Sequence, residues 1–292
     1  MTEMGGASPL VSAEELAAHL DDPDWIVVDC RFDLTDPDAG RRAWRAGHIP
    51  GAFYADLDRD LAAPAGHDGA GGRHPLPGRD DLTELFASWG VNAHSRVVAY
   101  DDAGNAFAAR LWWLLRDCGH PGAAVLDGGW PAWEAAGHPV SAERPESGQG
   151  SFEASPGALA LVDAGIVAAG LAAGDLLLLD ARVPDRFSGR TEPLDKCAGH
   201  VPGAVNTPLT NNLRADKCFR APAELQAYYR AVIGEKFMDQ VACMCGSGVT
   251  ACHTLLALEL AGMPGAALYA GSWSDWISDA GRPIATANGD EN

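Results

Sequence analysis

Residues 241–260 read VACMCGSGVTACHTLLALEL, which is a short apolar run, a glycine-rich loop and a longer helical pattern. The run Val241–Met244 predicts a buried strand, and Val249–Leu260 predicts the helix after it. A strand that passes through a short loop into a helix is the repeating unit of a parallel sheet covered on both faces. Ligands of such sheets bind to loops at the carboxyl ends of strands, so the loop after Met244 is a candidate site.

The first half of the chain contains a similar unit. Val97–Tyr100 predicts a strand, and Ala106–Arg116 predicts the helix that follows its loop. We expect the first strand of each half at Trp25–Val28 and Leu176–Leu179. Further strands are expected at Ala123–Leu126 and Ala266–Tyr269.

Three motifs occur twice, in the same order. The sequence GHIPGA at 47–52 returns as GHVPGA at 199–204. Asp29-Cys30-Arg31 is matched by Asp180-Ala181-Arg182, and the motif ending in Trp130 is matched by one ending in Trp273. Ordered matches at a near-constant spacing indicate a duplication.

The length of 292 residues suits two domains. We predict one domain at 1–143, a polar linker rich in Ser, Glu, Gly and Pro at 144–152, and a second domain at 153–292. The predicted fold class is α/β, in which each domain has a mostly parallel sheet covered by helices on both faces.

Composition excludes several classes of partner. The chain carries 21 Lys and Arg against 40 Asp and Glu, a net charge of −19, which disfavours nucleic acid and anionic membranes. No basic start precedes an apolar run, and no uncharged apolar window is long enough to span a bilayer. Seven scattered cysteines are typical of reduced thiols. We therefore expect a cytoplasmic protein.

The loop Cys245–Thr250 is suited to thiol chemistry. Its two glycines let backbone N–H groups converge on an anion, and the following helix adds positive potential. Ser247 and Thr250 can donate further hydrogen bonds. This environment favours a thiolate or persulfide, so Cys245 is the predicted nucleophile. The corresponding position of the first half holds Asp101, which cannot do thiol chemistry.

With these motifs the chain resembles the tandem-domain sulfurtransferases of the rhodanese superfamily, above all their 3-mercaptopyruvate branch. The resemblance covers nearly the whole chain and implies two rhodanese-like domains, a non-catalytic first and a catalytic second. It implies that sulfur passes from 3-mercaptopyruvate through a Cys245 persulfide to cyanide or a thiol, with release of pyruvate. Reduced thioredoxin is a candidate acceptor. Neither a cofactor nor a metal is expected.

The same resemblance assigns individual residues. Arg186, in Asp185-Arg186-Phe187, corresponds to an arginine that binds the substrate carboxylate. A second family arginine is absent in its usual form, which leaves Arg190 or Lys196 as candidates. The persulfide-binding backbone is implied for Gly246, Gly248, Val249 and Thr250.

A proton relay is also implied by the resemblance. Its members correspond to Ser247, His74 and Asp58. Because His74 and Asp58 lie in the first half, the first domain would contribute to the site across an interface.

Repetition points to structural roles for other residues. Arg182 is matched by Arg31 in the copy without a nucleophile, so each is expected to pair with a nearby carboxylate. His48 and His200 are likewise expected to stabilise turns. The tryptophans are expected to pack in the core and between the domains.

Two other kinds of site are disfavoured. A cysteine phosphatase needs an arginine six residues after its nucleophile, where this chain has Ala251. A zinc site would need Cys243, Cys245, Cys252 and His253 to converge, although neighbouring positions on a strand or helix diverge.

Three alternatives stay open at this point. The donor could be thiosulfate, as in rhodaneses that pass sulfane sulfur to cyanide or thiols. The chain could be a non-catalytic rhodanese-like module that binds a partner. Redox sensing is compatible with catalysis, with Cys243 or Cys252 resolving an oxidised Cys245 as a disulfide.

Overall fold

The computed structural model describes residues 8–66, 71–157 and 159–287. The chain divides into two compact units that exchange short segments. Residues 64–76 of the first half belong to the second unit, and residues 215–218 of the second half belong to the first unit. The predicted domain boundaries kept each half continuous, so this exchange was not foreseen.

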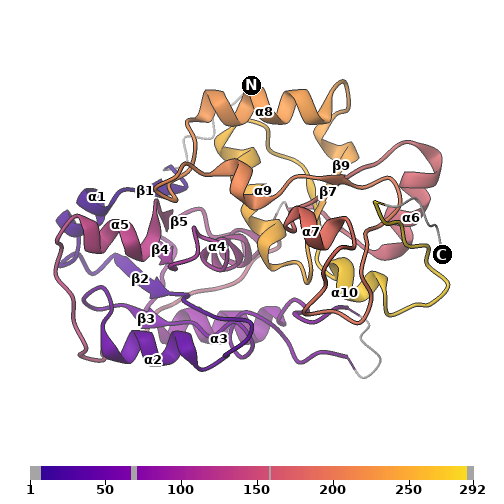
Figure 1. Cartoon of the computed structure of the whole chain (residues 1–292). Coiled ribbons are helices and arrows are strands. Elements are labelled where there is room, and N and C mark those ends of the chain that lie inside the picture. The colour runs from indigo at the N-terminus through magenta and orange to yellow at the C-terminus, as the bar shows by residue number, and fades with distance from the viewer. Residues whose placement is uncertain (1–7, 67–70, 158, 288–292) are drawn as a thin grey trace. The chain divides into compact units, whose positions relative to one another are not determined.

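The first unit is built on a five-stranded parallel sheet with the order β1-β5-β4-β2-β3 (Figure 1). In the central pair Trp25 lies opposite Arg96, and Asp29 lies opposite Tyr100. The strands are β1 (Leu10–Val11), β2 (Trp25–Asp29), β3 (Phe53–Tyr54), β4 (Arg96–Tyr100) and β5 (Ala123–Leu126). The helices are α1 (Ala13–Ala18), α2 (Ala39–Ala46), α3 (Arg79–Ser88), α4 (Ala108–Asp117) and α5 (Gly129–Ala135).

The second unit repeats this topology with the order β6-β10-β9-β7-β8. The duplication and the predicted fold class are thereby confirmed. The strands are β6 (Leu161–Val162), β7 (Leu177–Asp180), β8 (Val205–Asn206), β9 (Val241–Met244) and β10 (Ala267–Tyr269). The helices are α6 (Ala164–Ala173), α7 (Pro184–Phe187), α8 (Pro222–Ile233), α9 (Val249–Leu260) and α10 (Ser272–Trp276), with 3₁₀ turns at Leu209–Asn212 and Met238–Gln240.

The strands predicted to open each half are in fact second in chain order. The strand predicted at Trp25–Val28 is β2, and the one predicted at Leu176–Leu179 is β7. Each is preceded by a two-residue strand, β1 or β6, at the opposite edge of its sheet. The prediction of first strands was wrong because a two-residue strand is too short to show a hydrophobic period.

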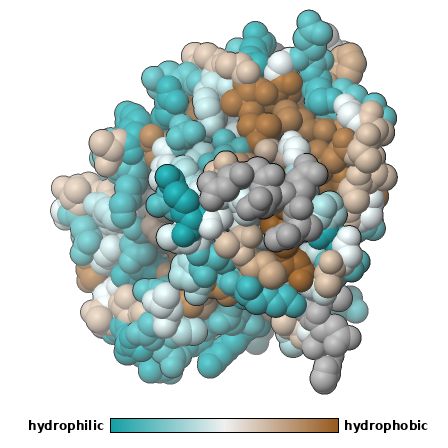
Figure 2. Space-filling model, turned by 45° about the vertical axis from the view of Figure 1, so that its right-hand side comes forward, coloured by the Kyte–Doolittle hydropathy of each residue, from teal (hydrophilic) through white to brown (hydrophobic). Residues whose placement is uncertain are grey.

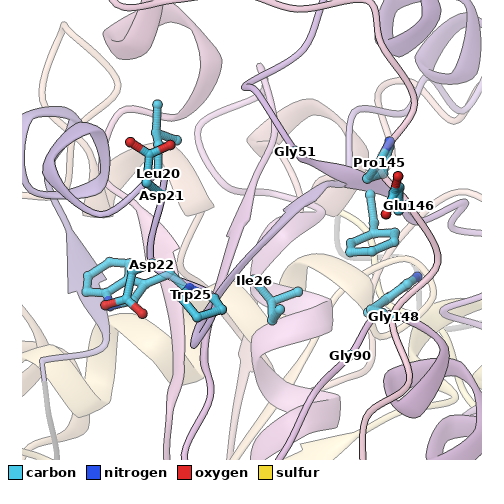
Figure 3. A pocket seen from close by; sticks show the side chains of 13 residues that line it. Leu20, Asp21, Asp22, Trp25, Ile26, Gly51, Gly90, Pro145, Glu146 and Gly148 are labelled. Atoms are coloured by element: carbon cyan, nitrogen blue, oxygen red, sulfur yellow. The ribbon is translucent and has the colours of Figure 1, made fainter.

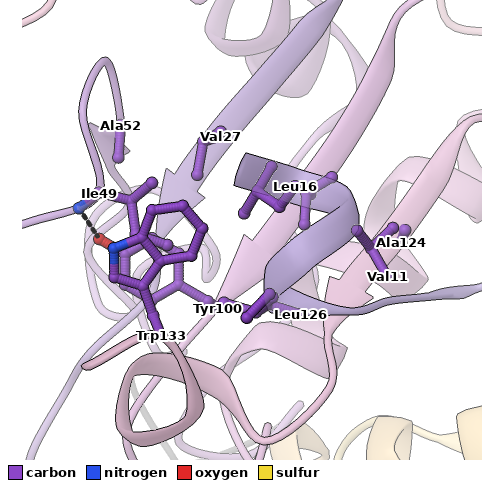
Figure 4. Packing of buried hydrophobic residues seen from close by; sticks show 11 residues of the cluster. Val11, Leu16, Val27, Ile49, Ala52, Tyr100, Ala124, Leu126 and Trp133 are labelled. Atoms are coloured by element: carbon purple, nitrogen blue, oxygen red, sulfur yellow. Dashed lines mark hydrogen bonds between the residues drawn. The ribbon is translucent and has the colours of Figure 1, made fainter. Parts of the chain in front are cut away.

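Each sheet packs one face against a cluster of apolar side chains. In the first unit, Trp133 lies over the sheet beside Ile49 and Tyr100 (Figure 4). Its indole N–H donates to the Pro139 carbonyl at 2.8 Å, so this large side chain is buried without an unsatisfied donor. In the second unit Trp273 and Trp276 are also buried. The predicted packing role of the tryptophans in the core is confirmed for these residues.

Buried ion pairs recur at the carboxyl ends of two equivalent strands. Arg31 pairs with Asp29, and Arg182 pairs with Asp180 at 2.7 Å. Both arginines also donate to a backbone carbonyl of the GH motif that follows. His48 bonds to the Trp44 and Glu143 carbonyls and therefore stabilises a turn. These findings confirm the structural roles predicted for Arg31, Arg182 and His48.

The segment 144–152 lies close against the end of α3. Gly148 N–H donates to the Ser88 carbonyl at 3.0 Å, and a β-carbon on Gly148 would lie 2.3 Å from the nitrogen of Gly90. Glycine is therefore required for this approach. The segment also lines a shallow hollow of about 310 Å³ in the first unit, with Pro145 and Glu146 facing Trp25 and Ile26 across it (Figure 3). None of the predicted site residues lines this hollow.

Hydrophilic residues cover much of the face in Figure 2, and hydrophobic residues gather in one area of it. Within the described ranges, no helix combines the length and the apolar character needed to cross a membrane.

Candidate active site

The loop between β9 and α9 presents Cys245 at the carboxyl end of the central strand of the second sheet. Gly248 ends this loop with a φ of +79°, and a β-carbon there would lie 2.1 Å from the Ala270 carbonyl oxygen. The loop therefore turns tightly against the chain after β10. Val249 and Thr250 begin α9, so the helix N-terminus lies next to the nucleophile position.

Hydrogen bonds from the motif Gly271-Ser272-Trp273 and from the adjoining Ser274 hold the loop. The N–H groups of Trp273 and Ser274 donate to the carbonyls of Cys245 and Gly246 at 3.1 and 2.9 Å. Cys245 N–H donates to the Ser272 hydroxyl oxygen at 3.0 Å, and this hydroxyl donates to the Tyr269 carbonyl. Ser272 had no predicted role, although it lies in the repeated motif that ends in Trp273. Its buried hydroxyl, which accepts from Cys245 N–H, fixes the backbone of the predicted nucleophile.

The same backbone contact identifies Asp101 as the counterpart of Cys245. In the first unit Trp130 N–H donates to the Asp101 carbonyl at 2.8 Å. The Asp101 carboxylate accepts four backbone N–H groups, those of Ala103, Asn105, Phe107 and Ala108, at 2.7–2.9 Å. Burial raises the pKa of this carboxyl, and the four N–H groups oppose that shift. In the first unit the Asp101 carboxylate therefore occupies these backbone donors in place of a sulfur anion.

His74 and Ser247 are in direct contact within the second unit. The Nδ1 atom of His74 lies 2.7 Å from the Ser247 hydroxyl oxygen, and each residue is 5% exposed. His74 lies in segment 64–76, which belongs to this unit. The segment is held because Gly71 N–H donates to Asp275 and Arg73 N–H donates to Ser274. Two of the three predicted relay residues are thus brought together.

Asp58, the third predicted relay residue, lies in the first unit. Its side chain is exposed, and its backbone N–H donates to Asp56 Oδ1 at 3.1 Å. Its role in a relay stays a prediction.

Arg186 lies beside the nucleophile loop, at the end of α7. Its Nε donates to both oxygens of Glu192 at 3.0 Å, and its Nη2 donates to Asp195 at 2.9 Å. Both terminal nitrogens would lie 3.3 Å from a β-carbon on Gly246. A guanidinium in this place can bind an anionic group of a substrate that reacts at Cys245.

The two candidates for a second cation, Arg190 and Lys196, are both exposed. Arg190 donates to Asp185 at an exposed position and lines a cavity of about 670 Å³ with Phe187 and His200. Lys196 is exposed. The residue that does lie near Gly246 is Arg73, whose Nη2 would be 3.3 Å from the same β-carbon position. Arg73 was not among the predicted site residues, although it adjoins the predicted relay histidine His74.

The neighbouring cysteines are buried. Cys243 in β9 and Cys252 in α9 are both 0% exposed, and burial, with a smaller effect of Cys252, raises the pKa of Cys243. The His253 ring stacks on Phe219 and contacts Asn212 through Nδ1. In the part of the chain that the structure describes, no group of three or more His, Cys, Asp or Glu could hold a metal ion.

A comparison with models of known protein families identifies the family of this chain. The model of the rhodanese-like domain matches this chain twice, at residues 12–136 and 163–279. The chain belongs to the rhodanese family. The two matched ranges fall in the two halves of the chain, and the sheets of these halves have the same strand order.

The relatives that match this chain over most of its length include several sulfurtransferases. This rhodanese is 47% identical to a probable 3-mercaptopyruvate sulfurtransferase of Pseudomonas aeruginosa, over 97% of this chain and 99% of that protein. It is 38% identical to a putative thiosulfate sulfurtransferase of Mycobacterium tuberculosis, over 94% and 96%. The solved 3-mercaptopyruvate sulfurtransferase of Leishmania major matches with a TM-score of 0.79 and 29% identity, covering 94% of this chain and 75% of that one. This rhodanese is accordingly a sulfurtransferase.

Proposed function

We propose that this sulfurtransferase takes sulfur from 3-mercaptopyruvate and passes it to a thiol or cyanide. The observation that carries the proposal is the grouping of Cys245, the Arg186 guanidinium and the His74–Ser247 pair around one loop. The Pseudomonas and Leishmania relatives, which bear the name of this activity, support the same donor.

The first half-reaction is a sulfur transfer to Cys245. The donor carboxylate binds Arg186, and the Cys245 thiolate attacks the donor sulfur. As the new S–S bond forms, the C–S bond breaks and its electron pair leaves with carbon as the enolate of pyruvate. The donor's thiol proton is equivalent to the proton that the enolate carbon gains, so the products are a cysteine persulfide anion and pyruvate.

Ser247 and His74 are suited to move that proton. Their contact of 2.7 Å allows the hydroxyl to exchange a proton with the imidazole, and both groups are shielded from bulk water. The persulfide anion is stabilised by the N-terminus of α9 and the backbone of the loop. In the second half-reaction an acceptor thiolate attacks the outer sulfur and releases the Cys245 thiolate.

Thiosulfate is the second candidate donor. The Mycobacterium relative is named for it, and the Arg186 guanidinium would also attract its sulfonate group. No basic residue lies within the loop Cys245–Thr250 itself, however, and this favours the carboxylate donor. For the acceptor we propose a small thiol or reduced thioredoxin. The seven free cysteines support a reducing, cytoplasmic compartment.

Intact-protein mass spectrometry tests the donor. After brief exposure to 3-mercaptopyruvate we expect a gain of one sulfur atom, with release of pyruvate and removal of the sulfur by a thiol. Loading by thiosulfate alone would replace the proposed donor with the second one. Loading by neither would favour a non-catalytic binding module.

The His74–Ser247 pair can be tested by a double-mutant cycle. Each of His74→Gln and Ser247→Ala is expected to lower kcat about 100-fold, because each removes one member of the proton path. Since the two residues act together, the double variant should be little slower than either single variant. Fully multiplicative losses would show that the residues act independently.

A further inference from the structure

Two side chains of α10 hold the segment that carries His74. The Ser274 hydroxyl oxygen accepts from the N–H of Arg73 at 3.0 Å, and Asp275 Oδ1 accepts from the N–H of Gly71 at 2.9 Å. Both side chains and the segment belong to the second unit. Because His74 directly follows Arg73, these bonds fix the backbone that leads to its imidazole.

The segment approaches α10 more closely than a side chain would allow. Gly72 has a φ of +83°, and a β-carbon there would lie 2.4 Å from the Gly271 carbonyl oxygen and 2.9 Å from the Ser274 hydroxyl oxygen. Such distances are far shorter than a van der Waals contact. Glycine at this position therefore lets the backbone reach the two acceptors.

Both acceptors are themselves anchored within the second unit. The N–H of Ser274 donates to the carbonyl of Gly246 in the nucleophile loop at 2.9 Å. Asp275 Oδ2 accepts from the Tyr269 hydroxyl at 2.5 Å and lies 3.5 Å from Arg282 Nη1. Burial raises the pKa of Tyr269, so this hydroxyl stays protonated and remains a donor. One rigid group thus joins the nucleophile loop to the segment.

The first unit lacks both acceptors. The two positions after the last residue of the repeated motif hold Ser274 and Asp275 in the second unit, and Pro131 and Ala132 in the first. A helix forms at this place in both units, so neither Ser nor Asp is needed for the helix itself. The pair occurs only in the copy that has the predicted nucleophile, which points to a role in the site.

We propose that Ser274 and Asp275 are positioning residues, which hold the segment so that the His74 imidazole meets the Ser247 hydroxyl. This role rests on the proposed function, because the His74–Ser247 pair carries the proton of the sulfur transfer. Their contact of 2.7 Å leaves little tolerance, since a displacement of about 1 Å removes most of a hydrogen bond. Release of the segment would therefore interrupt the proton path without removing either of its members.

Hydrogen exchange tests the docking without a sulfur donor. Mass spectrometry of the whole chain, with fragmentation that resolves single amides, follows the N–H groups of Gly71 and Arg73. Asp275→Ala removes the acceptor of the first amide, and Ser274→Ala removes that of the second. We expect each substitution to speed the exchange of its amide about tenfold. Ser274→Ala leaves the Tyr269 bond intact and provides the same test should Asp275→Ala lose its fold.

Asp279→Ala is the matched control for Asp275→Ala. Asp279 is an exposed carboxylate that lies 3.7 Å from the same arginine, Arg282, and its printed hydrogen bond is to Gly281 N–H. The control removes the same charge and should leave both exchange rates within about twofold of the wild type. Exchange in Asp275→Ala and Ser274→Ala as slow as in Asp279→Ala would overturn the docking.

A double-mutant cycle with His74 tests the positioning role. Asp275→Ala should lower kcat for 3-mercaptopyruvate about tenfold in the wild-type background and less than about twofold in His74→Gln, because a positioning residue acts only through the imidazole. Equal losses in the two backgrounds would overturn the role. Asp275→Asn keeps an oxygen that accepts from Gly71 N–H and should restore most of kcat, and a loss as large as that of Asp275→Ala would contradict the proposal.

Failure of the proposed function would give a different pattern. If the wild-type protein does not accept sulfur from 3-mercaptopyruvate but exchange is faster in the two alanine variants, the proposed donor is wrong and the docking of the segment stands. If the wild type turns over this donor and exchange is faster, but kcat is unchanged in Asp275→Ala and Ser274→Ala, the positioning role is wrong and the proposed function stands.

Discussion

Replacing Cys245 by serine is expected to abolish sulfur uptake, with a fall in turnover of about four orders of magnitude or more. The serine hydroxyl is almost entirely protonated at neutral pH and cannot form a persulfide, so the first half-reaction has no sulfur acceptor. The substitution is close to isosteric, and the N–H of residue 245 can still donate to Ser272. The fold should therefore survive. Intact mass after exposure to the donor, together with a pyruvate assay, measures the effect.

Cys197→Ser is the control for that experiment. Cys197 is a partly buried cysteine of the same unit, and its side chain packs against the core around Trp273. This variant should load one sulfur atom as the wild type does. Sulfur uptake by Cys245→Ser, or its loss in Cys197→Ser, would refute Cys245 as the sulfur carrier.

Replacing Gly248 by alanine is expected to destabilise the second unit by about 3–5 kcal/mol. The substitution has two costs. A φ of +79° is unfavourable for any residue with a β-carbon, and the new β-carbon would lie 2.1 Å from the Ala270 carbonyl oxygen. Both atoms belong to backbone segments joined to the core strands β9 and β10, so neither can move freely. The midpoint of urea unfolding, followed by tryptophan fluorescence, measures the change.

Gly174→Ala separates the two costs. Gly174 ends α6 with a nearly equal φ of +74°, and nothing lies within 4 Å of the position of its β-carbon. This substitution is therefore expected to lower the free energy of unfolding only by the strain of the left-handed backbone conformation, about 1 kcal/mol. Equal destabilisation by the two substitutions would show that the Gly248 loop relaxes away from Ala270 and that close approach is not required there.

The longer elements of the fold were predictable because their local signal is strong. The strand Val241–Met244 and the helix Val249–Leu260 have the predicted bounds, since a buried apolar run ends at a glycine-rich loop and a helical pattern begins directly after it. The edge strands were missed because two residues carry no period. Their positions are set by pairing with β5 and β10, which is a tertiary contact.

Some residues of the site were predictable from the sequence and others were not. The residue types and spacing of the Cys245 loop indicated a nucleophile, because glycines next to a helix N-terminus create local anion-binding geometry. Arg186 and His74 were assigned through the family resemblance, and the structure places both beside the loop. Arg73 was missed, since nothing in its local sequence shows which unit its segment joins.

The sequence by itself determined the duplication and the parallel α/β architecture, and it predicted a nucleophile at Cys245 and none at the corresponding Asp101. Each of these depends on residues that are adjacent in the chain or repeated along it. Only the tertiary structure decided which cations flank Gly246, how Ser272 holds Cys245 and where segment 64–76 lies. These features depend on contacts between residues far apart in the chain, and such contacts form only when the strands and loops pack together.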